Sequence, residues 1–160
     1  MSRDETHRGM PGRLRAWLDA EGVRYRYVEH GPTRTSEESA AARGEPLEIG
    51  AKALLLKVDD SYVLVVLSAA LKLRSNRFRR YLGASRLRFA TTEELDDLIG
   101  VPSGAVPPFG RPIVDLPLYI DRSVMRTDKS AFNAGTLTAS IIMSTDDYLR
   151  LARGTVVEVT

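Results

Sequence analysis

The sequence contains no cysteine. Disulfide bonds, thiolate nucleophiles and cysteine-based zinc or iron–sulfur sites are therefore excluded. Histidine is nearly as scarce, because only His7 and His30 occur, and no second histidine stands at ligand spacing from either of them. A metal site would have to be built from carboxylates alone. We therefore expect no metal and no other cofactor.

Long apolar runs are also missing. No stretch approaches the roughly 20 apolar residues that a membrane-spanning helix needs. The polar start MSRDETHRGM does not resemble a secretory signal peptide, so we expect a cytoplasmic protein without membrane contact. A length of 160 residues with 43% apolar composition fits one ordinary globular domain. We assign residues 1–10 to a flexible tail and residues 11–160 to a single domain, and nothing demands more than a monomer.

Acidic residues are absent from a long central stretch, residues 61–92. The basic residues of that stretch are Lys72, Arg74, Arg77, Arg79, Arg80, Arg86 and Arg88. Arginine has a planar guanidinium that suits phosphate recognition. The pattern fits either a solvated helix face whose acidic partners come from elsewhere in the fold, or a surface that binds nucleic acid or polyphosphate.

The apolar spacing predicts helices and strands without a strict βαβ rhythm. Helices are expected from about residue 11 to Gly22 and at 36–43, 74–83, 91–99 and 145–152, and strands at 23–30, 51–58, 62–67, 86–90, 112–121 and 139–143. The strands at 51–58 and 62–67 should form a hairpin with both faces covered. Pro117 predicts that its strand lies at a sheet edge. The expected class is α/β of the mixed α+β kind, a mixed sheet or partly closed barrel with helices around it.

Lys52 stands between two alanines at the head of the apolar strand 51–58. Burying a lysine in such a stretch is unfavourable unless the ammonium meets an anion. Lys52 therefore either marks the solvated end of the strand or faces a bound anion, and the sequence leaves both readings open. His30 precedes a capped helix, where a histidine is more often a structural hydrogen-bonding group than a catalyst.

Glycine and proline gather in GVPSGAVPPFG, residues 100–110, which we call the Gly/Pro loop. Glycine permits close approach of another molecule and proline stiffens the chain. Such a loop either is a structural turn or presents backbone N–H groups to a carbonyl oxygen or an oxyanion. A second stretch of this kind is FNAGTLT, residues 132–138, with Asn133, Gly135 and Thr136 as donors. With Lys52, the two stretches predict a site that positions and polarises a substrate rather than attacking it.

Taken in order, these motifs resemble the YbaK/ProX family of aminoacyl-tRNA deacylases, which is related to the editing insertion of bacterial prolyl-tRNA synthetases. The resemblance covers residues 12–152, and its motifs are EHGPTRT, Lys52 followed by ALLL, the basic segment after LKLR, EELDDLIGVPSGAVPPFG, Asp121 and FNAG. It implies a partly closed β-barrel flanked by helices. It also implies a trans-acting hydrolase that cleaves the ester between a wrong amino acid and the 3′-terminal adenosine of tRNA, without a metal or a covalent enzyme nucleophile.

The resemblance also implies roles for individual residues. Lys52 would contact the tRNA end, and the N–H groups of Gly104, Ala105 and Gly135 would hold the ester carbonyl oxygen. The other expected pocket residues are His30, Thr35, Ala53, Val106, Pro108, Asn133 and Thr136. The basic segment would attract the acceptor stem, through Lys72, Arg74, Arg77, Arg79 and Arg80. The expected partners are aminoacylated tRNA and, transiently, an aminoacyl-tRNA synthetase.

Three positions depart from the family pattern. Ala53 stands where many relatives have a polar residue, Leu137 where some have a histidine, and Ser140 near a position that is acidic in the YbaK branch. These changes imply a less polar pocket and leave the substrate open among alanine, serine, threonine and cysteine. The alternative function is a non-catalytic module of the same fold that binds the tRNA 3′ end without releasing the amino acid.

Overall fold

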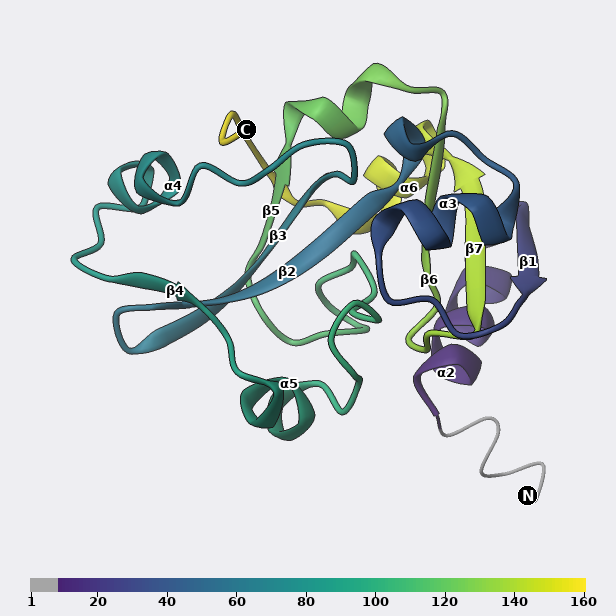
Figure 1. The fold of residues 1–160 in the computed structure, drawn as a ribbon, viewed down its shortest axis with the longest axis horizontal. Coiled ribbons are helices and arrows are strands. Elements are labelled where there is room, and N and C mark those ends of the chain that lie inside the picture. The colour runs from purple at the N-terminus through teal and green to yellow at the C-terminus, as the bar shows by residue number, and fades with distance from the viewer. Residues whose placement is uncertain (1–8) are drawn as a thin grey trace.

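The structure, a computed structural model, describes residues 9–160 and contains two sheets (Figure 1). The larger sheet has the order β4-β2-β3-β5-β8, with β2 (Ala51–Val58), β3 (Ser61–Ser68), β4 (Leu87–Phe89), β5 (Leu118–Asp121) and β8 (Thr155–Val157). The smaller sheet has the order β1-β7-β6, with β1 (Tyr25–Glu29), β6 (Lys129–Asn133) and β7 (Ala139–Ser144). A bridge between Gly50 and Ala131 joins the two sheets without closing them into a barrel. The predicted mixed, partly closed architecture is confirmed.

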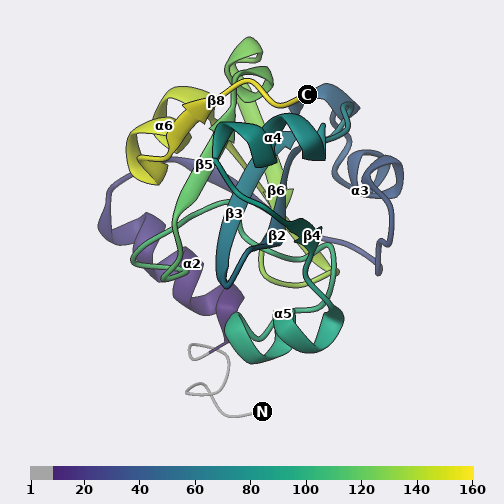
Figure 2. The same cartoon turned by 90° about the vertical axis from the view of Figure 1, so that its left-hand side faces the viewer.

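The helices are α2 (Met10–Ala20), α3 (Ser36–Arg43), α4 (Ser75–Tyr81), α5 (Thr92–Leu98) and α6 (Thr145–Ala152), with short 3₁₀ turns η1 (Leu47–Ile49) and η2 (Arg122–Arg126). Thr35, Thr91 and Ser144 each accept a hydrogen bond from the backbone N–H three residues later and so begin α3, α5 and α6. In Figure 2, α4 lies above and α5 below the strands of the larger sheet. None of the helices in residues 9–160 is long and apolar enough to cross a membrane.

The β2–β3 hairpin forms the centre of the fold, and Lys52 lies opposite Leu67 in its register. Both faces of β3 are buried: Leu64 and Val66 pack into one apolar cluster, and Val65 and Leu67 into a second cluster around Phe78. The predicted hairpin is confirmed, and β3 is covered on both faces, but Lys52, Ala53 and Leu54 of β2 are only partly buried. β2 pairs with the buried β3 along its whole length, which gives a rigid position to the strand that carries Lys52.

Several sequence predictions need correction. β5 begins only after Pro117 and lies between β3 and β8, so it is not an edge strand. Pro117 stands outside the ladder, where its missing N–H is not needed and its carbonyl accepts from Leu64 N–H at 2.9 Å. Strands β6 and β8 were not predicted. The spacing of Phe78, Tyr81 and Leu82 predicts one apolar helix face, but Tyr81 is 55% exposed.

The N-terminal boundary also differs from the prediction. α2 begins at Met10, one residue before Pro11, and the Met10 side chain is buried. Residues 1–8 of the predicted tail, including His7, lie outside the described residues.

Candidate active site

A cavity of about 340 Å³ lies between α3, the start of β2 and the Gly/Pro loop. Its walls come from five parts of the chain, at residues 33–43, 47–55, 89–95, 103–106 and 131–137, with Ala69 added. Long-range folding therefore brings together the three stretches that the sequence singled out, namely the head of β2, the Gly/Pro loop and the FNAGTLT stretch.

Lys52 is half-buried in this cavity wall. Its ammonium has no hydrogen bond or ion pair with any residue in the range 9–160. Burial lowers the pKa of Lys52, and the nearby charge of Lys72 lowers it further, while Glu37 acts in the opposite direction. The arrangement fits the anion-facing reading of Lys52 better than the solvated-end reading.

The charged side chains that line the cavity are all cations: Arg34, Arg43 and Lys52. No aspartate, glutamate, histidine or cysteine belongs to the lining as far as residues 9–160 are concerned. Cations that share a cavity with no facing carboxylate create a positive potential inside it. The cavity therefore favours an anionic ligand, or one that develops negative charge.

Arg43 was not predicted as a site residue. It is only 7% exposed, and its Nε donates to Ser140 Oγ and its Nη2 to Asn133 Oδ1, both at 3.1 Å. Burial lowers the pKa of Arg43 to about 10, with Glu45 acting in the opposite direction. A sequence signal existed, because helical spacing puts Arg43 on the same face as Ser39 and Ala40, and these three are the buried residues of α3.

His30 is not among the residues that line the cavity. Its Nδ1 lies 2.7 Å from Gly31 O, which can only accept, and its Nε2 lies 2.9 Å from Ser140 Oγ. In the neutral ring Nδ1 therefore donates and Nε2 accepts from the serine hydroxyl. These contacts give His30 a structural role toward Ser140, which is buried and holds Arg43, instead of the predicted contact with substrate.

Four other predicted residues line the cavity beside Lys52 and Gly104: Thr35, Ala53, Val106 and Asn133. Leu137, one of the departures from the family pattern, lines it as well. Asn133 Nδ2 donates to Gly104 O at 2.8 Å and so holds the Gly/Pro loop against the end of β6. Gly104 has φ +87°, a left-handed conformation that few other residues adopt.

The remaining predicted pocket residues do not line the cavity. Ala105 is fully buried, and its N–H donates to Pro102 O at 3.1 Å, so this N–H is not available to a substrate. Gly135 packs so closely against α2 that a Cβ on it would overlap Met10. Pro108 O accepts from the Tyr148 hydroxyl at 2.7 Å, and the Thr136 hydroxyl pairs with that of Thr138.

The five basic residues predicted to attract the acceptor stem lie in or just before α4: Lys72 and Arg74 precede it, and Arg77, Arg79 and Arg80 belong to it. Four of them are exposed: Lys72, Arg74, Arg77 and Arg80. Arg79 is half-buried and donates to Ala84 O at 3.1 Å, which gives it a local structural role. Three of the exposed arginines line a shallow hollow together with Ser75 and Asn76. None of the five basic side chains forms an ion pair with another described residue.

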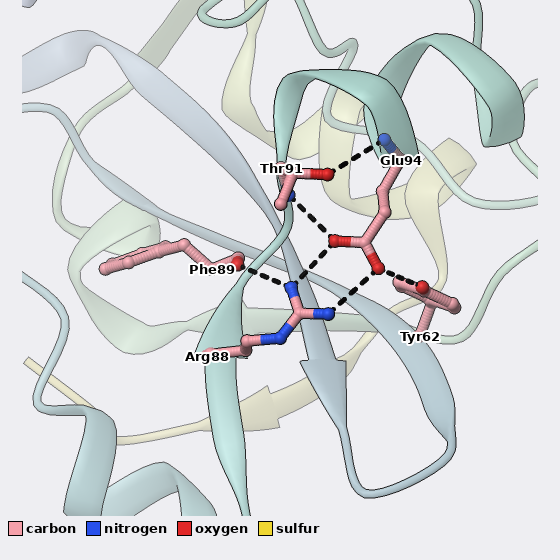
Figure 3. Close-up of polar contacts among 5 residues, drawn as sticks. All are labelled: Tyr62, Arg88, Phe89, Thr91 and Glu94. Atoms are coloured by element: carbon pink, nitrogen blue, oxygen red, sulfur yellow. Dashed lines mark hydrogen bonds and ion pairs between the residues drawn. The ribbon is translucent and has the colours of Figure 1, made fainter.

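Phe89 lies on the rim of the cavity with 57% of its surface exposed. The neighbouring Arg88 donates to Phe89 O at 3.1 Å and binds both carboxylate oxygens of Glu94, at 2.7 and 3.1 Å (Figure 3). Tyr62 also donates to Glu94, whose pKa lies well below its usual range because of Arg88, the Thr91 N–H and Tyr62. The backbone carbonyl of Phe89 is thus bonded to Arg88, and the guanidinium of Arg88 is in turn fixed by Glu94.

Comparison with known proteins gives three consistent findings. A family model described as an aminoacyl-tRNA editing domain matches residues 30–151. The chain is 38% identical over 149 residues, 88% of this chain and 87% of the other, to the multifunctional Ser/Thr-tRNA deacylase ProXp-y of Escherichia coli K12. It superimposes with a TM-score of 0.83 and 27% identity on a crystal structure described as a candidate trans-editing enzyme for prolyl tRNA synthetase, covering 94% of this chain and 96% of that one.

A more distant relative is the proline–tRNA ligase of Staphylococcus aureus strain Newman. The match is 25% identical over 99 residues, which is 61% of this chain but only 17% of the ligase.

Proposed function

The chain belongs to the aminoacyl-tRNA editing domain family, and on that basis we propose that it is a trans-acting aminoacyl-tRNA deacylase. The observation that carries the proposal is the cavity itself, where Lys52 has no hydrogen-bond or ion-pair partner among the described residues and no carboxylate belongs to the described lining. Such a cavity suits the phosphate-bearing 3′ end of a tRNA and the charge that develops when an ester is hydrolysed.

In this reaction water adds to the ester carbonyl carbon, and the carbonyl electron pair moves onto its oxygen. When this intermediate collapses, the bond from the carbonyl carbon to the ribose oxygen breaks. One proton of the water passes to that ribose oxygen, and the other stays with the new carboxyl group of the amino acid, which releases it to solvent on ionising. Free amino acid and uncharged tRNA result. Because the ester is already activated, holding the water and stabilising the oxyanion supply most of the acceleration.

We propose that the reaction needs neither a metal nor a covalent enzyme nucleophile. The absence of acidic, histidine and cysteine side chains from the described lining supports both parts of this proposal. The buried hydroxyl of Ser39 is already bonded to Thr33 Oγ1 at 2.9 Å, and Thr35 is committed to capping α3. We propose that a hydroxyl of the substrate's own terminal ribose activates the water.

We also propose that the enzyme acts as a monomer and meets aminoacyl-tRNA synthetases only transiently. The aminoacyl group is proposed to be seryl or threonyl, because the Escherichia coli relative is named a Ser/Thr-tRNA deacylase.

The decisive experiment is a panel of tRNAs carrying serine, threonine, alanine or cysteine on the 3′ end. Purified protein is incubated with each, and loss of the labelled amino acid is followed against spontaneous hydrolysis. We expect rapid release of serine or threonine. Tight tRNA binding without release from any member would instead favour the non-catalytic binding module, and neither binding nor release would leave only the fold in common with the family.

We predict that Phe89 stacks on a base of the tRNA end, because an exposed ring on the rim of a cationic cavity is a suitable platform for an unpaired base. Phe89→Ala should weaken tRNA binding by about tenfold, consistent with the ~1–3 kcal/mol that stacking of one base contributes. Titration of labelled tRNA measures the dissociation constant. Leu98→Ala is the matched control, because Leu98 is an exposed apolar residue of α5 outside the cavity lining and its loss should leave binding unchanged.

Electrostatic contact between α4 and the acceptor stem predicts a salt-dependent affinity. Replacing Arg77 and Arg80 together with glutamine should lower the slope of log K against log salt concentration by about 0.7–0.9 for each phosphate contact that is lost. Binding isotherms at a series of salt concentrations give this slope. Arg122→Gln serves as the control, because Arg122 is already paired with Glu158 at 3.1 Å. An unchanged slope in the double variant would place the tRNA on another surface.

A further inference from the structure

Arg43 carries hydrogen-bond donors that the protein does not use. A guanidinium has five N–H groups, and here Nε serves Ser140 and Nη2 serves Asn133, while Nη1 has no partner in the part of the chain that is described. No side-chain nitrogen or oxygen of the described residues is both fully buried and unpaired. Since Arg43 lines the cavity, Nη1 is reached from inside it.

The positive charge of Arg43 is not neutralised by a carboxylate. The nearest acidic influence comes from Glu45, but that carboxylate forms its ion pairs with Arg26 at 3.4 Å and with Lys129 at 2.9 Å. With a pKa of about 10, Arg43 remains protonated at neutral pH. A buried cation without an anionic partner destabilises the ligand-free fold, and a bound ligand with negative charge offsets that cost. Arg43 is therefore poised to meet an electron-rich oxygen in the cavity.

Asn133 connects Arg43 directly to the Gly/Pro loop. Its Oδ1 accepts from Arg43 Nη2 at 3.1 Å, and its Nδ2 donates to Gly104 O at 2.8 Å. One amide side chain thus links the guanidinium to Gly104, and all three residues line the cavity. Arg43 is consequently held one side chain away from Gly104, where the sequence predicts that the aminoacyl group binds.

The donors that the sequence assigned to the ester carbonyl are mostly occupied or displaced. The Ala105 N–H is bonded to Pro102 O, and Gly135 lies outside the cavity wall against Met10. A cationic donor in the same cavity, joined to Gly104 through Asn133, fills the same requirement, because charge-assisted hydrogen bonds are roughly twice as strong as neutral ones. We propose that Arg43 Nη1 donates to the carbonyl oxygen of the bound aminoacyl ester and stabilises its negative charge as water adds to the carbonyl carbon.

This inference rests on the proposed deacylase function, and the test separates the two. Steady-state deacylation is measured for wild type, Arg43→Met and Arg43→Ala on whichever aminoacyl-tRNA the wild type hydrolyses. Because the interaction strengthens in the transition state, we expect kcat to fall about 100-fold while KM changes less than threefold. Arg26→Met is the matched control, since it removes an exposed arginine of β1 outside the cavity and should retain full activity.

Chemical rescue provides a readout that a purely structural role would not move. Guanidinium ion at millimolar concentration should restore at least a tenth of the kcat of Arg43→Ala by occupying the vacated space. Urea, which is planar and of similar size but neutral, should restore none. Arg43→Lys, which keeps the charge but loses the fork, should have an intermediate kcat.

Each of the remaining outcomes would overturn either the proposed function or the role proposed for Arg43. A wild-type protein that hydrolyses no member of the panel would overturn the proposed function. An active wild type with Arg43→Met retaining kcat within threefold would overturn this inference alone. Equal rescue by urea and guanidinium, or loss of the folded state in all three Arg43 variants by circular dichroism, would show that Arg43 is structural. A loss confined to serine and threonine esters, with alanine ester hydrolysis unchanged, would move Arg43 from the carbonyl to the amino-acid side chain and equally overturn it.

Discussion

Lys52→Ala is expected to lower kcat/KM for deacylation by about a thousandfold while leaving the melting temperature almost unchanged. The ammonium contacts no described partner, so its removal breaks no hydrogen bond or ion pair of the fold. Its pKa is lowered chiefly by burial, which means that the folded protein holds this charge at an energetic disadvantage. A group held in this way contributes to ligand binding and transition-state stabilisation rather than to folding, and loss of a preorganised electrostatic contact is worth about 10²–10³ in rate.

The matched control for this prediction is Lys57→Ala. Lys57 lies five residues further along the same strand, outside the cavity lining, with its ammonium 5.8 Å from the centre of the Tyr62 ring. It should therefore be dispensable for deacylation. Rates are measured with mischarged tRNA, and melting by circular dichroism. A large fall in melting temperature for Lys52→Ala, or equal activity losses at the two lysines, would contradict the role assigned to Lys52.

Local rules were sufficient for most elements of the fold. The Thr35–Glu38 pair placed the start of α3, and the two apolar runs around Asp59 placed the hairpin, since capping and turn chemistry act over a few residues. β8 escaped prediction because three residues of TVV become a strand only through parallel pairing with β5. Such pairing depends on tertiary contacts, which propensity does not encode.

The candidate site shows the same division between local and long-range information. Lys52 and Gly104 stood out because each breaks a local pattern. Lys52 is a charged residue in an apolar strand, and Gly104 is a flexible residue in a loop stiffened by proline. Arg43 did not stand out, because its partners Asn133 and Ser140 are separated from it by 90 and 97 positions along the chain. The N–H of Ala105 was predicted to be free for a substrate, but in the structure it donates to the carbonyl of Pro102 within a turn. Which backbone donors remain free depends on the turn geometry, and composition does not specify that geometry.

Asp121→Ala is expected to have the largest effect on stability. Asp121 is 1% exposed, and its carboxylate accepts from the backbone N–H groups of Ser123 at 3.0 Å and Val159 at 2.7 Å, and from the Thr160 hydroxyl at 3.0 Å. Alanine would leave both buried N–H groups without a partner, at about 1–3 kcal/mol each. The expected loss of about 3 kcal/mol corresponds to a melting temperature about 10 °C lower.

The matched control is Asp115→Ala, because Asp115 is an exposed aspartate paired only with exposed Arg111, and such pairs contribute about 0–1 kcal/mol. Urea unfolding compares the free energies of unfolding. A loss at position 121 no larger than at position 115 would mean that the C-terminal segment finds other partners when the carboxylate is removed.

The pH dependence of stability tests the same carboxylate in its ionised form. Burial alone would raise the pKa of Asp121, but the hydrogen bonds from Ser123, Val159 and Thr160 outweigh burial and hold the pKa below its ordinary value. A carboxyl with a lower pKa in the folded than in the unfolded state contributes stability that is fully present above the unfolded pKa, about 4, and is lost as the pH falls through the folded value. The difference in unfolding free energy between wild type and Asp121→Asn should therefore be constant from about pH 7 to pH 5 and shrink below about pH 4. A difference that stays the same down to pH 3 would show that the bonds to Val159 and Ser123 do not depend on the charge.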